Sequence, residues 1–415
     1  MDPDSVRQAR LRAGLSLAQV AGAELTRQAV HLIETGKVQP SARSLQLIAR
    51  RLGVPAHTFL AESAEGEPAQ RRAAELERLC ERQRYRDVVE LAHRLLEGDR
   101  ATQMEAVARL YLGRALAQLG RADEAVGHLR RARQLFEAKD PWSAAEAREW
   151  EAAALYVGES PRAEVAEDGL GRYRALEPRR PAIEARMLEH LGTILIQRRN
   201  YLRAHQCYED ALHVAGPVLD LLRLGHIYHG LSRCHASLGD MRRAIELASR
   251  AVALYAVEND LRPVPARMDL PRAENDLSMM LIRDRQLDRA EELVDSALAH
   301  LDEAGAQRLR GYLLLTLAEV RQLQRRQDEA LLLIDQAIDL AERLNERAAL
   351  AAAHRQLGEV REERGEHDQA DRCFERALAV LAEAGTTGPR EECLAAYRGM
   401  LEARGDVDRL ERIAG

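Results

Sequence analysis

From residue 69 to its C-terminus, the chain alternates between apolar stripes at helical spacing and short polar turns, and the pattern repeats about every 40 residues. In each repeat an alanine follows the turn by two to five residues. These alanines are Ala125, Ala163, Ala204, Ala244, Ala290, Ala330 and Ala370, at spacings of 38, 41, 40, 46, 40 and 40 residues. A repeat of this length holds two helices, so the pattern predicts a stack of helical hairpins.

Two further positions keep a constant distance from that alanine and are small in nearly every repeat. Seven residues later stand Ala132, Leu170, Ala211, Ala251, Ala297, Ala337 and Ala377. Twelve residues earlier stand Gly113, Glu151, Gly192, Ser232, Ser278, Ala318 and Gly358. Antiparallel helices that approach closely need small residues where they cross, so the same crossing is predicted in each repeat. The repeat around Ala163 departs from the pattern at both positions.

This register resembles that of the tetratricopeptide-repeat (TPR) family, although its period exceeds the usual ~34 residues. Residues 69–98 fit a degenerate first unit and residues 389–415 a partial unit or cap, which gives eight units and a cap. The resemblance implies an α-solenoid, a right-handed superhelix of helical hairpins whose concave face is lined by the first helix of each unit. The 46-residue spacing predicts a loop over residues 258–271, which contains three prolines.

The first sixty residues have a different pattern, with five short helical segments separated by capping and turn residues. The segments are 5–13, 17–22, 27–35, one opened by Pro40-Ser41, and a last short helix carrying Phe59 and Leu60. Ser16 and Thr26 are suitable N-caps for the second and third segments. Two short helices joined by a tight turn are typical of a helix-turn-helix domain. The whole chain is therefore predicted to be all-α, with a domain at 1–60, a linker at 61–69 and a repeat body at 70–415.

The residues of this first domain resemble the phage-repressor (XRE/Cro-type) helix-turn-helix family over residues 5–60. The resemblance is carried by Gly14-Leu15-Ser16, Val20-Ala21, Thr26-Arg27-Gln28-Ala29-Val30, Ile33-Glu34-Thr35-Gly36-Lys37, Pro40-Ser41 and Leu52-Gly53-Val54. It implies that the segment from Thr26 to Thr35 lies in the major groove of double-stranded DNA. The implied base-contacting residues are Arg27, Gln28, His31 and Leu32, and the implied phosphate-contacting residues are Ser16, Thr26, Lys37 and Arg43.

The side chains at these positions have suitable chemistry. Arg27 can bond O6 and N7 of guanine, Gln28 can bond N6 and N7 of adenine, and Leu32 can contact a thymine methyl group. The alternative is that Arg27, Gln28 and His31 form an ordinary solvated helix face.

Charge separates the two parts of the chain. The 415 residues carry a net charge of −6, but residues 1–60 hold eight Lys and Arg against four Asp and Glu, so the head is +4 and the rest −10. A basic head on an acidic body is typical of a nucleic-acid-binding module joined to a part that does not bind nucleic acid. Aromatic residues make up only 4% of the chain, which favours helix over sheet.

Several functional classes are not expected. The five cysteines show no paired spacing and no secretory signal or membrane-length apolar stretch is found, so a cytoplasmic protein is expected. No phosphate-binding loop, dinucleotide fingerprint, nucleophile elbow or HExxH motif occurs. His226-x-x-His229 followed by Cys234-His235 lacks a four-ligand zinc spacing. We therefore expect no enzyme activity, metal or cofactor.

The register also predicts which side chains face the groove of the repeat body. Glu189, Thr193 and Gln197 are expected on its wall. The residues predicted to contact a ligand are His226, His229, Arg233, Arg272, Asn275, Met279, Arg283, Tyr312 and Gln322. Their arginines can hold a carboxylate and Asn275 can bond a peptide backbone. The alternative is that these are ordinary solvated helix residues.

The domain order resembles that of the RRNPP family of peptide-pheromone receptors. This resemblance implies a homodimeric transcriptional regulator that takes part in quorum sensing, with a peptide or other small effector bound in the TPR groove. A different interpretation is a TPR scaffold or antitoxin-like regulator that binds a partner protein, with DNA binding an accessory property. The sequence does not distinguish a short peptide from a protein partner in the groove.

Overall fold

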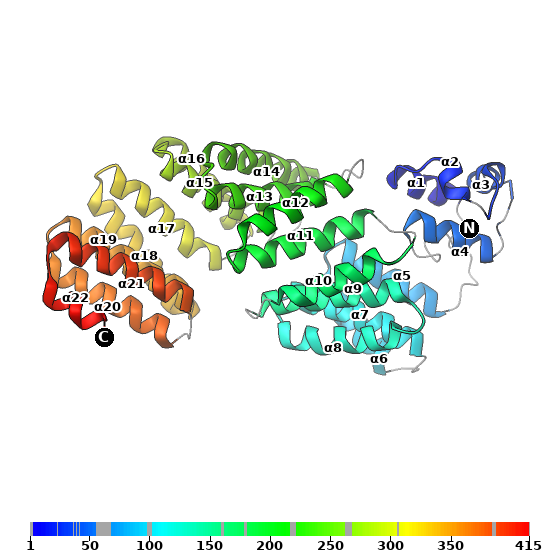
Figure 1. Ribbon diagram of the computed structural model, residues 1–415, viewed down its shortest axis with the longest axis horizontal. Coiled ribbons are helices and arrows are strands. Elements are labelled where there is room, and N and C mark those ends of the chain that lie inside the picture. Colours follow the sequence, from blue (N-terminus) through cyan, green and yellow to red (C-terminus); the bar gives the residue numbers. More distant parts are fainter. Residues whose placement is uncertain are drawn as a thin grey trace. The chain divides into compact units, whose positions relative to one another are not determined.

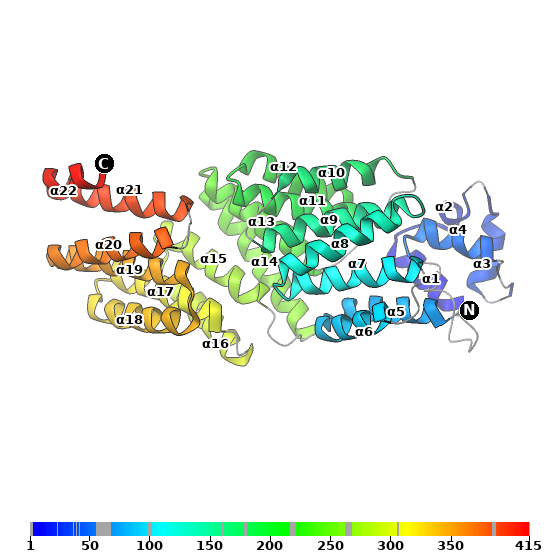
Figure 2. The same cartoon turned by 90° about the horizontal axis from the view of Figure 1, so that it is seen from below.

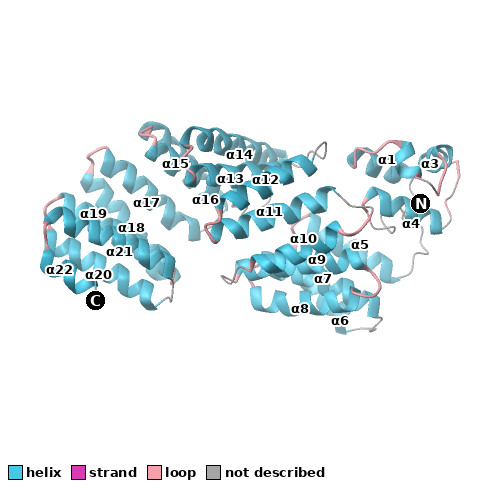
Figure 3. Cartoon of the chain, viewed as in Figure 1, coloured by secondary structure: helices cyan, strands magenta, loops and turns pink. Residues whose placement is uncertain are grey.

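The computed structural model describes residues 3–22, 24–35, 37–38, 40, 42–54, 68–97, 102–158, 162–177, 181–215, 221–261, 268–304, 307–383 and 387–414. All regular structure within these ranges is helical and no strand occurs in them (Figure 3). The predicted all-α class is therefore confirmed. The chain divides into two compact units, Met1–Asp240 and Met241–Gly415, and each is described by itself.

The head of the first unit contains four described helices (Figure 1). They are α1 (Pro3–Arg12), α2 (Leu17–Ala21), α3 (Arg27–Glu34) and α4 (Ala42–Leu52). Their shared core consists of Val6, Val20, Ala21, Val30, Ile33, Leu45, Ile48, Ala49 and Leu52. The expected fifth helix, with Phe59 and Leu60, lies outside the described residues, as does the expected linker up to residue 67. The next helix begins at Pro68.

The rest of the first unit is a series of helical hairpins. Its helices are α5 (Pro68–Glu81), α6 (Tyr85–Glu97), α7 (Thr102–Gln118), α8 (Ala122–Phe136), α9 (Pro141–Val157), α10 (Ala163–Arg174), α11 (Pro181–Gln197), α12 (Tyr201–Ala215) and α13 (Leu221–Ser237). The helix that opens each hairpin packs on the opening helix of the next, from α5 through α7, α9 and α11 to α13. These opening helices therefore form a continuous layer within the unit.

The second unit continues the same design. Its helices are α14 (Met241–Leu261), α15 (Asp269–Arg283), α16 (Leu287–Ala304), α17 (Gln307–Leu323), α18 (Gln327–Leu344), α19 (Arg347–Glu363), α20 (His367–Glu383), α21 (Thr387–Arg404) and α22 (Val407–Ala414). Here α15, α17 and α19 form the corresponding layer. The expected loop at 258–271 is shorter than predicted, because α14 continues to Leu261 and α15 begins at Asp269. Pro271 lies in the first turn of α15, where a helix tolerates proline.

The predicted helix crossings are confirmed by burial. The repeat alanines from Ala125 to Ala370 are all buried. A side-chain carbon built on Gly113 would come within 2.4 Å of Leu129, and one built on Gly358 within 2.8 Å of Phe374. The exception, Glu151, is also buried, and its carboxylate pairs with Arg130 at 2.7 Å and Arg148 at 2.9 Å. In this unit, a glutamate that forms two ion pairs therefore stands where the other units have a small residue.

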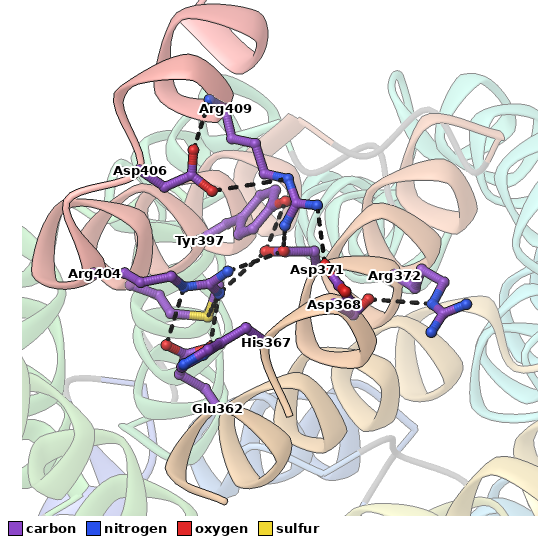
Figure 4. A network of polar contacts seen from close by, with 10 residues as sticks. Glu362, His367, Asp368, Asp371, Arg372, Tyr397, Arg404, Asp406 and Arg409 are labelled. Carbon is purple, nitrogen blue, oxygen red and sulfur yellow. Dashed lines mark hydrogen bonds and ion pairs between the residues drawn. The ribbon is translucent and has the colours of Figure 1, made fainter. Parts of the chain in front are cut away.

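The cap at the end of the second unit is attached through a polar network (Figure 4). Helix α21 packs on α20 and α22 packs on α21 (Figure 2). The buried carboxylate of Asp371 on α20 accepts bonds from Tyr397 Oη at 3.2 Å and Arg404 Nη1 at 3.0 Å, and it pairs with Arg409 on α22. Arg404 also bonds Glu362 on α19 at 2.7 Å. The last hairpin is thus held by charge pairs as well as by apolar contacts.

The turns inside the hairpins provide a test of backbone strain. In most hairpins one residue of the turn after the first helix takes a left-handed conformation, and it is glycine at Gly120 and Gly365 but arginine at Arg285 (φ 62°) and Arg325 (φ 63°). Only glycine adopts this conformation without steric cost. We expect Arg285→Gly and Arg325→Gly each to raise the free energy of unfolding of the second unit by about 0.5–1 kcal/mol, measured by urea unfolding.

The matched control for this prediction is Gly365→Ala, which should lower the same free energy by about 1 kcal/mol. Both arginine side chains are exposed, so their removal should cost no buried contact. A loss of stability in both Arg→Gly variants would show that the turn conformation is not strained.

Candidate functional site

Both helices of the helix-turn-helix motif begin at the predicted caps. Ser16 Oγ accepts the N–H of Gln19 at 3.3 Å, and the Gln19 side chain accepts the N–H of Ser16 at 2.8 Å. Thr26 Oγ1 accepts the N–H of Ala29 at 3.0 Å. Each hydroxyl keeps its own proton for donation and both residues are exposed. The two predicted phosphate contacts therefore lie at helix starts, where backbone N–H groups favour anions.

The sequence predicts a solvent-exposed recognition face on α3. Val30 and Ile33 are buried in the head, whereas Arg27, Gln28 and His31 are exposed. Leu32 is half-buried, at the border between the two faces. The structure thus brings the three polar candidates together on one side of the helix.

The other two predicted phosphate contacts lie after α3. Lys37 is exposed, and its backbone N–H donates to the carbonyl of Leu32 at 2.9 Å, which fixes the turn that follows the helix. Arg43 belongs to α4, and its side chain is outside the described part of the chain.

Two arginines fix the helices of the head. Arg10 on α1 donates from Nε and Nη2 to Glu34 on α3, at 2.6 and 2.9 Å, and from Nη1 to the carbonyl of Leu15 at 3.2 Å. The hydrogen bond with Glu34 raises the pKa of Arg10. Arg51 on α4 donates to the carbonyl of Val20 at 2.9 Å, at the end of α2. Helix α3 is therefore held by a part-buried ion pair as well as by its apolar face.

In the first unit, the predicted ligand residues are those of α13. His226, His229 and Arg233 are all half-buried. His226 Nδ1 lies 3.0 Å from the carboxylate of Glu189 on α11, which also accepts from Arg223 Nη1 at 2.9 Å. Glu189 is therefore not the open groove position that the sequence predicts, because it is buried and ion-paired. Burial alone would raise the pKa of Glu189, but His226 and Arg223 outweigh it and lower the pKa to about 2.

This carboxylate makes the stability of the first unit depend on pH. The pKa of Glu189 is lower in the folded protein, so its contribution is present above pH 4.5 and is lost as the pH falls toward 2. Between pH 6 and pH 3 we expect this one group to account for about 2 kcal/mol of the loss in unfolding free energy. Glu189→Gln should lack this part, so its urea-unfolding profile should be flatter by that amount.

The control for this experiment is Glu124→Gln, because Glu124 pairs with Arg121 on the surface of the same unit. Its pH profile should differ little from that of the parent protein. Equal profiles for Glu189→Gln and the parent would contradict the role given to the buried carboxylate.

In the second unit, the predicted ligand residues lie on α15 and α17. Arg272, Met279 and Arg283 are exposed on α15, and Tyr312 is exposed on α17. Asn275 is buried between the two helices, and its Oδ1 accepts from Thr316 Oγ1 at 2.8 Å. Gln322 donates to Glu363 on α19 at 2.8 Å. The structure therefore brings this subset together on one layer of helices, with Asn275 and Gln322 already engaged within the protein.

Sequence reasoning missed a second set of residues on the layer of the first unit. Arg186 on α11 donates to Glu146 at 2.9 Å and to Glu149 at 3.2 Å, and Arg114 on α7 lies 3.6 Å from Glu146. The repeat register contains the signal that identifies them. Arg186 stands six residues before the small residue of its unit, as His226 and Arg272 do, and Arg114 stands one residue after, as Arg233 and Met279 do.

The described residues contain no group of three or more His, Cys, Asp or Glu side chains placed to hold a metal ion. None of their helices has both the length and the apolar character needed to cross a membrane.

Each of the two domains matches a known protein family. Residues 6–59 match the helix-turn-helix family and residues 310–383 match the tetratricopeptide-repeat family. No curated protein sequence matches the chain.

Solved structures extend the likeness to the fold of nearly the whole chain. The apo form of the quorum sensor NprR from B. thuringiensis is 12% identical over 90% of this chain and 99% of its own, with a TM-score of 0.59. A Rap protein complexed with competence and sporulation factor is 14% identical over 92% and 98%, with a TM-score of 0.55. Apo RapI is 13% identical over 68% and 99%, also at 0.55. The chain thus joins an N-terminal helix-turn-helix domain to a TPR body, and its fold is similar to that of NprR and the two Rap proteins.

Proposed function

We propose that this protein is a sequence-specific DNA-binding transcriptional regulator whose TPR body binds a peptide or other small effector. The observation that carries the proposal is the exposed face of α3, where Arg27, Gln28 and His31 stand together behind the Thr26 cap. Arginine and glutamine are the side chains that read guanine and adenine by paired hydrogen bonds. A helix-turn-helix presents such a face to the major groove.

The role of the repeat body is supported by the fold that it shares with a quorum sensor, NprR, and with a Rap protein solved with competence and sporulation factor. In this proposal, the effector binds the layer of opening helices. The effector binds one curvature of the body more tightly than another. This difference in affinity shifts the population of DNA-binding states.

We infer a homodimer, because one helix-turn-helix head buries little DNA surface and symmetric pairing is the usual way to reach useful affinity. The two heads would then read half-sites about 34 Å apart or a multiple of it. A change of a few ångströms between the heads would be enough to alter binding.

The test is selection from a random duplex library with the full-length protein near physiological salt, followed by sequencing of the retained duplexes. A two-fold symmetric site is expected. Retention without sequence preference would contradict sequence-specific regulation, and a single asymmetric half-site would contradict the homodimer. Repeating the selection with cell extract tests whether an effector changes retention, as the proposal requires.

A further inference from the structure

Four side chains form a stack of rings and cations across the opening helices of the first unit. The guanidinium of Arg114 on α7 lies 5.1 Å from the ring of Tyr111 and 5.0 Å from the ring of Trp150 on α9. The guanidinium of Arg186 on α11 lies 5.3 Å from the same Trp150 ring. Trp150, only 6% exposed, is thus the centre of a cluster that links three helices.

This cluster contains hydrogen-bond donors without acceptors. Arg114 Nε, Arg186 Nε and Trp150 Nε1 are buried, and none has an acceptor among the described residues. Glu146 is 3.6 Å from Arg114, which is too far for a hydrogen bond. A buried donor left unpaired destabilises the folded protein. Three of these donors gather in this one cluster, so an acceptor that enters it meets unpaired N–H groups.

The two arginines remain reachable. Their side chains are 21% and 14% exposed, for Arg114 and Arg186 respectively. Stacking against a ring leaves the edge of a guanidinium, with its fork of N–H donors, available to a planar acceptor. A carboxylate is the acceptor that this fork matches with two parallel bonds.

The charges of the cluster disfavour a ligand with more than one negative charge. Burial alone would raise the pKa of Glu146 and of Glu149. Arg186 together with Arg114 outweighs burial at Glu146, and Arg186 together with His190 outweighs it at Glu149, so both pKa values are lowered. Both carboxylates are therefore ionised and balance the two arginines. A dianion such as phosphate would meet two fixed negative charges, whereas a carboxylate adds only one.

We propose that Arg114, Trp150 and Arg186 form a subsite for a carboxylate group of the effector. The proposal rests on effector binding by the repeat body, and it specifies the chemistry of that binding. The carboxylate bonds the edge of Arg114, which has no hydrogen-bonded acidic partner, and then competes with Glu146 for Arg186. The carboxylate can belong to a peptide C-terminus or to an acidic side chain.

Trp150 supplies a direct signal, because the chain has only two tryptophans and Trp142→Phe leaves it alone. The full-length Trp142→Phe protein is titrated at constant ionic strength with N-acetyl-triglycine, its C-terminal amide, and N-acetyl-Gly-Glu-Gly-amide. A saturable change in Trp150 fluorescence is expected with the first or third probe and none with the amide. The first probe reports a C-terminal carboxylate and the third a side-chain carboxylate.

Variants in the same background separate binding from structural damage. Arg114→Gln should weaken binding at least tenfold, and Arg114→Lys should restore little because lysine lacks the fork. Glu146→Gln removes the competing carboxylate and should tighten binding severalfold, which a damaged fold would not do. Arg131→Gln, on a half-exposed arginine near Glu105, is the control and should leave binding unchanged.

No saturable response to either carboxylate, or an equal response to the amide, overturns the subsite. Weaker binding in Glu146→Gln does so too, since the cluster would then have only a structural role. The titration contains no DNA. A failed subsite with intact site selection therefore leaves the proposed function standing, and a failed site selection does not affect this result.

Discussion

Replacing Arg27 and Gln28 together by alanine is expected to abolish the preference of the protein for its selected DNA site while the head stays folded. Each paired hydrogen bond to the correct base is worth about 1–3 kcal/mol of discrimination. Loss of both should therefore remove about 2–6 kcal/mol per head. Neither side chain belongs to the core, and Thr26, which caps the helix, is retained.

The measurement is fluorescence anisotropy with the selected duplex and with a scrambled duplex of the same length. The ratio of the two affinities reports base reading, whereas the affinity for scrambled DNA reports phosphate contacts. The chain offers a matched control in Arg7 and Gln8, an exposed arginine–glutamine pair on α1. The Arg7→Ala/Gln8→Ala protein should keep its site preference. A preserved preference in the α3 variant would place base reading elsewhere on the head.

The periodic part of the fold could be predicted because helix crossings permit few residues. The alanines, glycines and serines of the register are buried where predicted, and Gly113 leaves no room for a side chain against Leu129. The irregular unit could not be predicted in the same way. A glutamate at a crossing breaks the pattern of small residues. The structure explains this exception, because Arg130 and Arg148, from two helices, pair with Glu151.

The wall of the repeat body was predicted less well than its core. A register identifies which positions share a face but not which side chains pair across helices. Glu189 was expected to be exposed in the groove. It is instead buried and paired with His226 and Arg223, which lie 34 or more residues away in sequence. Asn275 likewise bonds Thr316, which lies 41 residues further along. Such pairs depend on side-chain geometry between neighbouring hairpins, which the sequence pattern does not specify.

The second large effect is expected at the ion pair between α1 and α3. Arg10→Met leaves Glu34, whose side chain is 3% exposed, as a buried carboxylate without its cation. Loss of one partner of a buried pair typically costs about 3–5 kcal/mol. Since small domains have only about 5–15 kcal/mol of stability, much of the stability of the head should be lost. Hydrogen exchange of the α3 amides in the full-length protein measures this free energy.

Two further variants make the result interpretable. Arg10→Met/Glu34→Leu replaces both charges by apolar groups and should restore most of the protection, because no uncompensated charge remains. Arg121→Met breaks a similarly close arginine–glutamate pair, at 2.7 Å, but on the surface at the start of α8, and should not change exchange of the α8 amides measurably. Unchanged α3 exchange in Arg10→Met would mean that the apolar core alone holds the helix. Restored protection with weaker DNA binding in the double variant would instead show that the ion pair sets the position of α3 rather than its stability.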